Sequence, residues 1–371
     1  MRRIGYYIHE RKEWPDFFWN QEVLTMSLSE VRNKQGRLLG KMETLGFHLL
    51  EEAVLSTLSL DVLKSSEIEG EFLNPDQVRS SIARRLGIDI AGLLPSDRNV
   101  DGVVEMMLDA TQNYQKPLSK ERLCHWHASL FPSGKSGMYS ITIGDWRKDE
   151  TGPMQVVSGA LGKEKIHFQA PDATVIEKEM TRFIDWFNSD SALDPVMKAG
   201  LAHVWFVTIH PFDDGNGRIA RALTDMLLAR ADESRQRFYS MSAQIRILRN
   251  EYYDILEKTQ KGTLDLTEWM AWFLACIKDA LSATDENLSG VLKKAKYWEQ
   301  HAQTTLNVRQ REILNKMFEG FFGKMSSSKW AKMGKCSADT ALRDIQDLIS
   351  KGMLEKDGAG GRSTNYQLKY L

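Results

Sequence analysis

The chain has 371 residues, of which 42% are hydrophobic and 27% charged, with a formal net charge of −1 at pH 7. This balance is that of a globular protein of two or three domains, and it excludes binding to nucleic acid or membrane by overall charge. The sequence has no apolar signal core or membrane-spanning window, and its cysteines lack metal-ligand spacing, so we expect a cytoplasmic protein with reduced thiols and no membrane partner.

Residues 1–90 are predicted to form an N-terminal helical extension. A long helix is expected near Gln21–Glu52, and a shorter helical stretch at Leu60–Ile68. Gly70 would end the second stretch, because glycine readily adopts the left-handed conformation that terminates helices. Glu69 would then lie at a helix end, which is also where an ordinary surface helix could carry a glutamate.

Residues 99–283 are predicted to form the central domain. Its first helix is expected to end at His125–Phe131. Two histidines two positions apart face different ways on a helix, so His125 and His127 are interpreted as structural.

A β-hairpin is predicted inside this domain. The β-prone runs Gln155-Val156-Val157 and Lys165–Phe168 flank the turn Ser158–Gly162, which is the pattern of a hairpin. An exposed edge strand can bind an extended peptide through backbone hydrogen bonds. An ordinary surface hairpin is the alternative.

A helix, a short loop and a second helix follow. Val196–Ile209 has the apolar spacing of a buried helix. Pro211 stops it, because the residue before a proline is pushed out of the α region. His210 is therefore expected at the helix exit, facing a cleft, and Ile219–Arg230 resumes the helical periodicity.

The loop between these helices carries several groups suited to phosphate chemistry. The turn Gly215-Asn216-Gly217 leads into a helix N-terminus, whose free N–H groups bind anions. Asp214 is a hard oxygen ligand suited to Mg²⁺, and His210, with an ordinary pKa of about 6.5, can take a proton from a hydroxyl. Arg218 and Arg221 share a helix face and can both reach a polyphosphate. Each group alone is common, but together they fit nucleotide transfer from a triphosphate.

One further feature of the central domain lies downstream of the loop. The segment Asn250–Tyr253 begins another helix, where Tyr252 would pack either on an adenine or in the core.

Residues 306–371 are predicted to form a winged helix-turn-helix. Helices are expected at Glu312–Phe318, at Ser327–Met333 and after the N-cap Ser337. The third helix would turn four apolar residues inward, and a hairpin would follow; these inward residues are Leu342, Ile345, Leu348 and Ile349.

This C-terminal segment has a modest basic excess. Between His301 and Leu371 there are 12 Lys/Arg and 7 Asp/Glu, and the expected phosphate contacts are Lys335, Arg343 and Arg362. The layout is typical of DNA binding, but many such modules dock proteins or form homodimers. The sequence leaves these partners open.

The segment His210–Arg221 resembles the signature of Fic-domain proteins, His-Pro-Phe-x-[Asp/Glu]-Gly-Asn-Gly-Arg-x-x-Arg, at every defined position. The resemblance implies an all-α fold with a helical bundle core and a small hairpin flap. It also implies transfer of AMP from ATP to a protein hydroxyl, with His210 as base, Asp214 holding Mg²⁺, the Gly-Asn-Gly turn cradling phosphates, and both arginines at the β/γ end. The Doc branch, which phosphorylates, has a lysine at the position of Gly217.

Two other segments fit the same resemblance. Ser65–Gly70 matches the inhibitory motif [Ser/Thr]-x-x-x-Glu-[Gly/Asn] at Ser65 and Glu69, which implies that Glu69 pairs with Arg221 and blocks the γ-phosphate position. In some relatives this glutamate also supports AMP removal. The hairpin at Gln155, Val156 and Val157, followed by Pro171, corresponds to the flap that positions the target.

Two classes of function therefore stand at this point. The first is an autoinhibited protein adenylyltransferase that uses ATP and Mg²⁺ and modifies Ser, Thr or Tyr of a target or of itself. The second is a DNA-binding transcriptional regulator whose Fic domain senses a nucleotide. Transfer of UMP or phosphocholine would keep the same site and change the donor.

Overall fold

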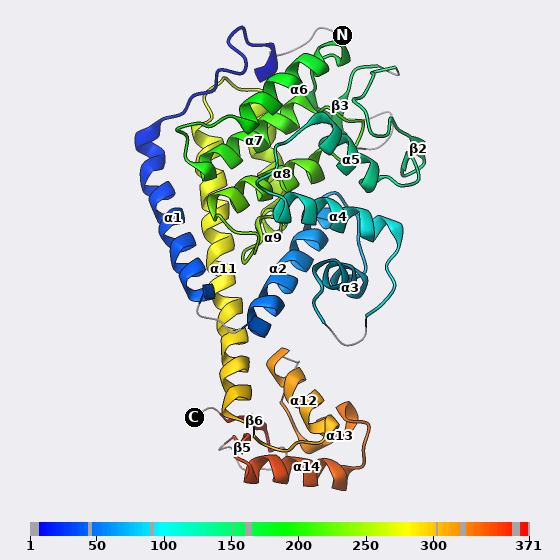
Figure 1. Cartoon of the computed structure of the whole chain (residues 1–371), viewed down its shortest axis with the longest axis vertical. Helices are drawn as coiled ribbons and strands as arrows, with labels where there is room; N and C mark the ends of the chain where they lie inside the picture. Colours follow the sequence, from blue (N-terminus) through cyan, green and yellow to red (C-terminus); the bar gives the residue numbers. More distant parts are fainter. Residues whose placement is uncertain are drawn as a thin grey trace. The chain divides into compact units, whose positions relative to one another are not determined.

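The computed structural model describes residues 7–43, 47–89, 93–150, 152–159, 165–301, 303–319, 324–357 and 364–369 (Figure 1). The chain divides into two compact units, Met1–Asp285 and Glu286–Leu371, which are considered one at a time. Helices predominate and the strands form small two-stranded hairpins, which confirms the predicted all-α class.

The N-terminal region contains a 3₁₀ turn, Ile8–Glu10 (η1), and the helices α1 (Gln21–Glu43), α2 (Phe47–Ile68) and α3 (Pro75–Leu86). The single helix expected over Gln21–Glu52 is wrong, and Leu60–Ile68 is only the end of α2. Each helix has its own apolar stripe, with Leu24, Val31 and Leu38 buried in α1 and Leu55, Leu58 and Val62 buried in α2. Apolar spacing alone therefore did not show where the first helix ends and the second begins.

Two helices, α4 (Arg98–Gln112) and α5 (Lys120–Leu130), open the central region where one was expected to end at His125–Phe131. Pro117 separates them, since a proline disfavours helix at the residue before it. The Ser119 hydroxyl then caps α5 by accepting a hydrogen bond from the Arg122 N–H, a typical N-cap contact.

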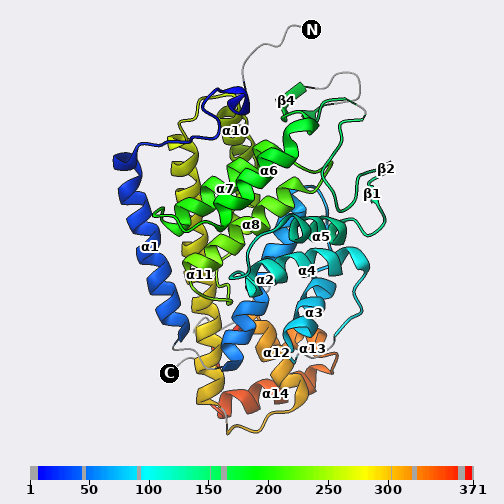
Figure 2. The same cartoon turned by 45° about the horizontal axis from the view of Figure 1, so that its top comes forward.

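The helices α7 (Pro195–Ile209) and α8 (Asn216–Ala231) form the centre of the first unit, with α6 (Ala173–Asn188) against α7 (Figures 1 and 2). Every residue of α7 from Val196 to Ile209 is buried. A helix that is apolar all round requires neighbours on every side, so α7 fixes the position of the loop that follows it.

Three further helices complete this unit: α9 (Met241–Ile247), α10 (Arg249–Gln260) and α11 (Thr267–Gln300), the last of which runs on into the second unit. The end of α2 packs against α9. Within the described ranges, none of the helices has the length and apolar character needed to span a bilayer.

Two hairpins lie on the first unit. The strands β1 (Lys135–Ser136) and β2 (Tyr139–Ser140) pair antiparallel, as do β3 (Gln155–Ser158) and β4 (Lys165–Gln169). The second pair is the hairpin expected from the sequence. Most of its turn, residues 160–164, lies outside the described residues.

The second unit contains α12 (Val308–Glu319), α13 (Ser327–Met333), α14 (Ala338–Ser350) and the antiparallel strands β5 (Leu354–Lys356) and β6 (Tyr366–Leu368). Trp330 is fully buried at the centre of its core. One expected core residue is wrong: Leu342 is 41% exposed. The inward face of α14 instead follows Ala341, Ile345 and Leu348 at i, i+4 and i+7, which turns Leu342 away. Arg362 lies outside the described residues.

Candidate active site

His210 lies at the exit of α7, as the sequence predicted. It caps the helix in the left-handed conformation, with φ 52° and ψ 59°. Its Nδ1 lies 3.3 Å from the Val207 carbonyl oxygen, so Nδ1 carries the proton and Nε2 keeps a free lone pair. Burial lowers the pKa of His210 to about 4, which keeps the ring neutral at physiological pH. The residue is thus set up to accept a proton.

Arg147, which the sequence analysis did not single out, holds the backbone around His210. Its side chain donates to the carbonyl of His210 at 2.8 Å and to that of Pro171 at 2.5 Å, and it also pairs with Asp149. Its own N–H donates to the Pro211 carbonyl at 2.9 Å. One buried guanidinium therefore ties the loop of the signature to the end of the β3–β4 hairpin.

Replacing Arg147 with methionine is expected to lower the free energy of unfolding by about 3 kcal/mol, because removing one partner of a buried pair leaves the other groups unpaired. Chemical denaturation of the full chain measures this change. The control is Arg182→Ala, since Arg182 also bonds a backbone carbonyl, that of Trp14, but is half exposed. The control substitution should lower the free energy of unfolding by less than about 0.5 kcal/mol. Equal effects of the two variants would contradict the structural role of Arg147.

Asn216 fixes the loop from the inside. Its side-chain oxygen accepts from the Phe212 N–H at 3.0 Å, and its amide nitrogen donates to the Phe212 carbonyl at 2.8 Å. The Phe212 ring is buried and stacks on His127, with centroids 4.2 Å apart. The Asn216 side chain is therefore committed to the loop, and its backbone N–H is what it can offer to an anion.

Asp214 is part of this loop and is partly buried. One oxygen accepts from the Gly215 N–H at 2.6 Å, and the other is bonded by the Ser136 hydroxyl on β1. Among the described residues no cluster of three or more His, Cys, Asp or Glu could hold a metal. A single carboxylate nevertheless suits Mg²⁺, which keeps several waters and takes its other ligands from substrate phosphates.

The start of α8 forms a concave backbone surface. Gly215 is the N-cap with φ 80°, a conformation that glycine adopts without strain. Gly217 follows in the first turn, and a Cβ atom there would lie 2.2 Å from Glu69 Oε1. Glycine at 217 is thus what allows a carboxylate to approach this helix N-terminus.

Ser65 lies in the last turn of α2 and Glu69 directly follows that helix. Both residues contact Arg221 of α8. Arg221 donates to Glu69 Oε1 at 2.8 Å, to the Ser65 hydroxyl at 2.9 Å and to the Ser65 carbonyl at 2.8 Å. Its guanidinium is buried, whereas the Glu69 side chain is 31% exposed. These contacts bring together all three residues that the sequence linked.

Arg218 is engaged in a similar way by a residue that the sequence analysis missed. Its Nη1 donates to Glu71 Oε2 at 2.6 Å, and its guanidinium lies over the Phe131 ring. Its Nε is buried and makes no hydrogen bond to the described part of the chain. Both signature arginines thus bind carboxylates that follow α2. Only the spacing of Glu71, two positions after Glu69, could have suggested this.

Tyr252 lies in the core of the first unit and also reaches the candidate site. It is buried, and its hydroxyl bonds Nε2 of His203 at 2.8 Å, while Nδ1 of His203 bonds Thr224 at 2.9 Å. Tyr253 is the more open of the two tyrosines, and its ring packs under the Arg249 guanidinium. Both tyrosines border the cavity described next.

A cavity of about 480 Å³ brings part of this set together. It is bordered by His210, Gly217, Glu69 and, on β3, Val156 and Val157, whereas Asp214, Arg218 and Arg221 are not among its lining residues. Gln155 does not border it and bonds the Gln169 side chain across the hairpin at 3.1 Å. The base, the helix N-terminus and the hairpin therefore share one space.

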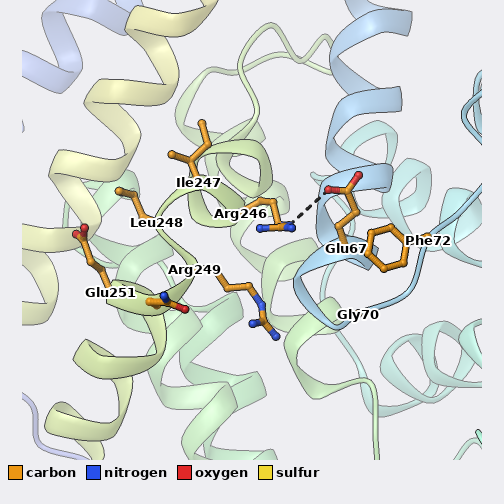
Figure 3. Close-up of a pocket in the computed structure, with 9 residues that line it drawn as sticks. Glu67, Gly70, Phe72, Arg246, Ile247, Leu248, Arg249 and Glu251 are labelled. Atoms are coloured by element: carbon orange, nitrogen blue, oxygen red, sulfur yellow. Dashed lines mark ion pairs between the residues drawn. The ribbon is translucent and has the colours of Figure 1, made fainter.

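A second hollow lies behind the end of α2 (Figure 3). There Glu67 pairs with Arg246 at 3.4 Å, and Arg249 donates to the Ile68 carbonyl at 2.8 Å. Glu67 also pairs with Lys64 at 2.8 Å. No signature residue borders this hollow. Of these contacts, the bond from Arg249 holds the backbone of α2 at Ile68, the residue before Glu69.

Two family profiles match the chain. The profile of the Fic/DOC family matches residues 117–228, and the Domain of unknown function (DUF4172) matches residues 7–88. The first match contains the whole loop between α7 and α8, and the second contains α2.

Curated relatives and solved structures agree with the first match. Protein adenylyltransferase fic-1 of Caenorhabditis briggsae is 28% identical over 184 residues, covering 49% of this chain and 34% of the relative. Protein adenylyltransferase Fic of Drosophila willistoni is 38% identical over 104 residues, covering 28% and 19%. The chain thus spans about a third or less of each of these relatives.

Among solved structures, a Fic family protein from Desulfovibrio desulfuricans G20 has a TM-score of 0.54 at 19% identity, over 95% of this chain and 97% of the other. Residues 134–508 of Fic-1 from C. elegans have a TM-score of 0.50 at 21% identity, over 72% of this chain and 74% of the other. At these identities the likeness concerns the fold.

Proposed function

We propose that this chain, which carries a Fic/DOC domain at residues 117–228, transfers AMP from ATP to a hydroxyl group of a protein and is restrained by its own Glu69. One observation carries the proposal. The carboxylate of Glu69 lies 2.8 Å from Arg221, in the cavity that also contains His210 and the N-terminus of α8. A base, an anion site and an internal anion occupy a single space.

In this reaction the target hydroxyl oxygen attacks the α-phosphorus of ATP. His210 Nε2 takes the proton, the new P–O bond joins AMP to the target, and the bond to the β-phosphate breaks to release pyrophosphate. The free lone pair on Nε2 and the neutral ring supply the base. Arg147 keeps that ring in place by bonding the His210 carbonyl.

The phosphates of ATP would bind the first turn of α8. The free N–H groups at a helix N-terminus favour anions, and Arg218 and Arg221 add charge-assisted bonds. Asp214 would hold Mg²⁺, which neutralises the phosphate charge when bound. Ser136 would orient the Asp214 carboxylate through its hydroxyl.

Glu69 restrains this reaction by occupying an arginine that ATP needs. While Arg221 binds Glu69, it cannot bind the terminal phosphate, and two anions at one guanidinium repel each other. The close approach of Glu69 to Gly217 places the carboxylate beside the phosphate cradle as well. ATP would therefore bind with its phosphates displaced from the reactive pose.

The target would be held along β3. Among the described strands β3 pairs only with β4, so its other edge can add an extended segment by backbone hydrogen bonds. Val157 is 49% exposed at this edge and borders the cavity. This arrangement would present a Ser, Thr or Tyr hydroxyl to His210 with little demand on the target's sequence.

The test of this function is transfer of label from ATP labelled at the α-phosphate to proteins of a cell lysate, using the Glu69→Gly chain with Mg²⁺. Labelled protein supports the proposal. No labelled protein with Glu69→Gly would sink it for this donor, and UTP and CDP-choline would be assayed next.

A DNA-binding role for the second unit rests on exposed basic residues. Lys335 precedes α14 and Arg343 lies on it, and both are exposed. The helices α13 and α14 are followed by a hairpin, which is the order of elements in a winged helix.

The full chain is then expected to bind duplex DNA with an affinity that falls as salt rises. Lys335→Ala with Arg343→Ala should weaken binding at least about tenfold, whereas His210→Ala should not. Absence of DNA binding in a gel-shift assay would contradict this role.

A further inference from the structure

Two glutamates flank the glycine that follows α2, and each contacts a different arginine of α8. Glu69 is bonded by Arg221 at 2.8 Å, and Glu71 is bonded by Nη1 of Arg218 at 2.6 Å. Gly70, between the two glutamates, has φ 84°, a conformation that glycine adopts without strain. One tight turn therefore brings two carboxylates to two neighbouring arginines of a single helix.

The end of α2 gives no local reason for a carboxylate at either position. The Gly70 N–H donates to the Glu67 carbonyl at 3.1 Å, and the Glu71 N–H donates to the Ser66 carbonyl at 3.0 Å. These two bonds form a Schellman motif, which closes a helix through its backbone alone. The C-terminus of a helix also carries a partial negative charge and favours cations. Both glutamates are thus placed against this preference, and the arginines of α8 compensate their charge.

Arg218 is an arginine that is set up to bind an anion. Its side chain is 3% exposed and lies over the Phe131 ring, and its Nε is buried without a hydrogen bond to the described residues. It belongs to the first turn of α8, where the free N–H groups favour anions. Glu71, in contrast, is 47% exposed, so water can replace Arg218 as its partner. An incoming phosphate can therefore open this ion pair and keep the arginine.

A role of Glu71 as a simple counter-ion is the alternative, since a buried guanidinium is unfavourable without a partner. The two roles differ in what they imply for ATP. A counter-ion that only stabilises the fold leaves the affinity for ATP unchanged when its charge is removed. An internal competitor for the phosphates weakens ATP binding while it is present, because two anions at one guanidinium repel each other.

We propose that Glu71 is a second internal restraint, which keeps Arg218 from the terminal phosphates of ATP independently of the restraint that Glu69 places on Arg221. The inference rests on the proposed function, because it assigns a regulatory role to a residue of the same site. With one carboxylate on each arginine, the triphosphate end is excluded at two points. Since both carboxylates follow α2 directly, displacement of the end of that helix would release both arginines together.

The experiment measures how tightly the full chain, with Mg²⁺, binds an ATP analogue that has a methylene group between its α- and β-phosphates and so cannot transfer AMP. Glu71→Gln keeps the shape of the side chain and removes its charge. It should bind the analogue about fivefold more tightly than wild type, as expected for release of one partly exposed ion pair. The affinity for AMP should change less than about twofold, because AMP lacks the phosphates that Arg218 would bind.

The matched control is Glu52→Gln. Glu52 also lies on α2, its carboxylate is 2.8 Å from Arg79, and its side chain is 48% exposed. This variant should bind the analogue as wild type does. Independence is tested in the Glu69→Gly chain, where Glu71→Gln should again tighten binding about fivefold, since effects at separate partners add.

The outcomes separate this inference from the proposed function. An unchanged affinity for the analogue overturns the inference, even where the Glu69→Gly chain labels protein. Equal tightening for AMP, equal tightening in Glu52→Gln, or an effect that vanishes in the Glu69→Gly chain overturns it as well. Tighter binding of the analogue by a chain that labels no protein would support Glu71 as a restraint on phosphate binding and would overturn only the proposed transfer.

Discussion

Replacing Glu69 with glycine is expected to raise AMP transfer about 10- to 100-fold. The substitution removes the carboxylate bound to Arg221 at 2.8 Å and frees the guanidinium for ATP. Hydrogen bonds to charged groups contribute about 1.5–3 kcal/mol, which corresponds to this range of rates. Glu69 follows the last residue of α2, so glycine at this position leaves the helix intact. The initial rate of label transfer from α-labelled ATP measures the change.

The matched control for this prediction is Glu67→Gln. Glu67 lies two positions earlier, but its carboxylate pairs with Lys64 and Arg246 at the hollow of Figure 3, away from Arg221. Its loss should leave the rate within about fivefold of wild type, since partly exposed ion pairs contribute at most about 1 kcal/mol, which is about a fivefold change in rate. Equal activation by both substitutions would mean that the end of α2 restrains transfer through its general position and not through the Glu69 carboxylate.

Replacing His210 with alanine in the Glu69→Gly chain is expected to reduce transfer by about 10²- to 10⁴-fold, the usual effect of losing a general base. ATP binding should persist, because the phosphates are held by α8 and the two arginines. The measurement pairs the rate of label transfer with the affinity for a fluorescent ATP analogue. A rate that stays within about threefold of the Glu69→Gly chain would show that another group takes the proton.

The pH dependence follows from the same residue. Because burial lowers the pKa of His210 to about 4, its base form is already complete at pH 6. The contribution of His210 to the rate is therefore expected to be constant from about pH 6 to 8 and to fall only as the pH drops towards 4. His125→Ala is the control histidine substitution, since His125 is exposed and pairs only with Glu105 among the described residues. That variant should transfer AMP at an unchanged rate.

The candidate site could be predicted where its groups are close in sequence. His210, Asp214 and the glycines of the turn lie within one loop, so the spacing of apolar residues and the position of Pro211 defined the two helices and the loop between them. The pairing of Glu69 with Arg221 was predicted on a different basis. It spans 152 positions and was expected only because the two motifs resemble those of one family.

Contacts between distant segments without a motif could not be predicted. Arg147 joins the His210 loop to Pro171 through carbonyl groups, which any residue supplies, so no side-chain pattern marks them. His167 of β4 bonds Ser158 of β3 at 2.6 Å and Glu257 of α10 at 2.5 Å, and these bonds depend on how the three elements meet. Similarly, Leu342 was predicted to face the core but is exposed. Apolar character alone did not distinguish Leu342 from the neighbouring Ala341 as the residue of α14 that faces inward.

The most direct test of the account compares two labelled forms of ATP with the Glu69→Gly chain, Mg²⁺ and a cell lysate. With label at the α-phosphate, protein should become labelled in Glu69→Gly, weakly in wild type and not in Glu69→Gly/His210→Ala. With label at the γ-phosphate, the chain should add no labelled protein beyond that of the lysate alone, since pyrophosphate carries the label away. Labelling from the γ-phosphate above that background would identify phosphoryl transfer instead, and no added label from either form of ATP would contradict the proposed reaction.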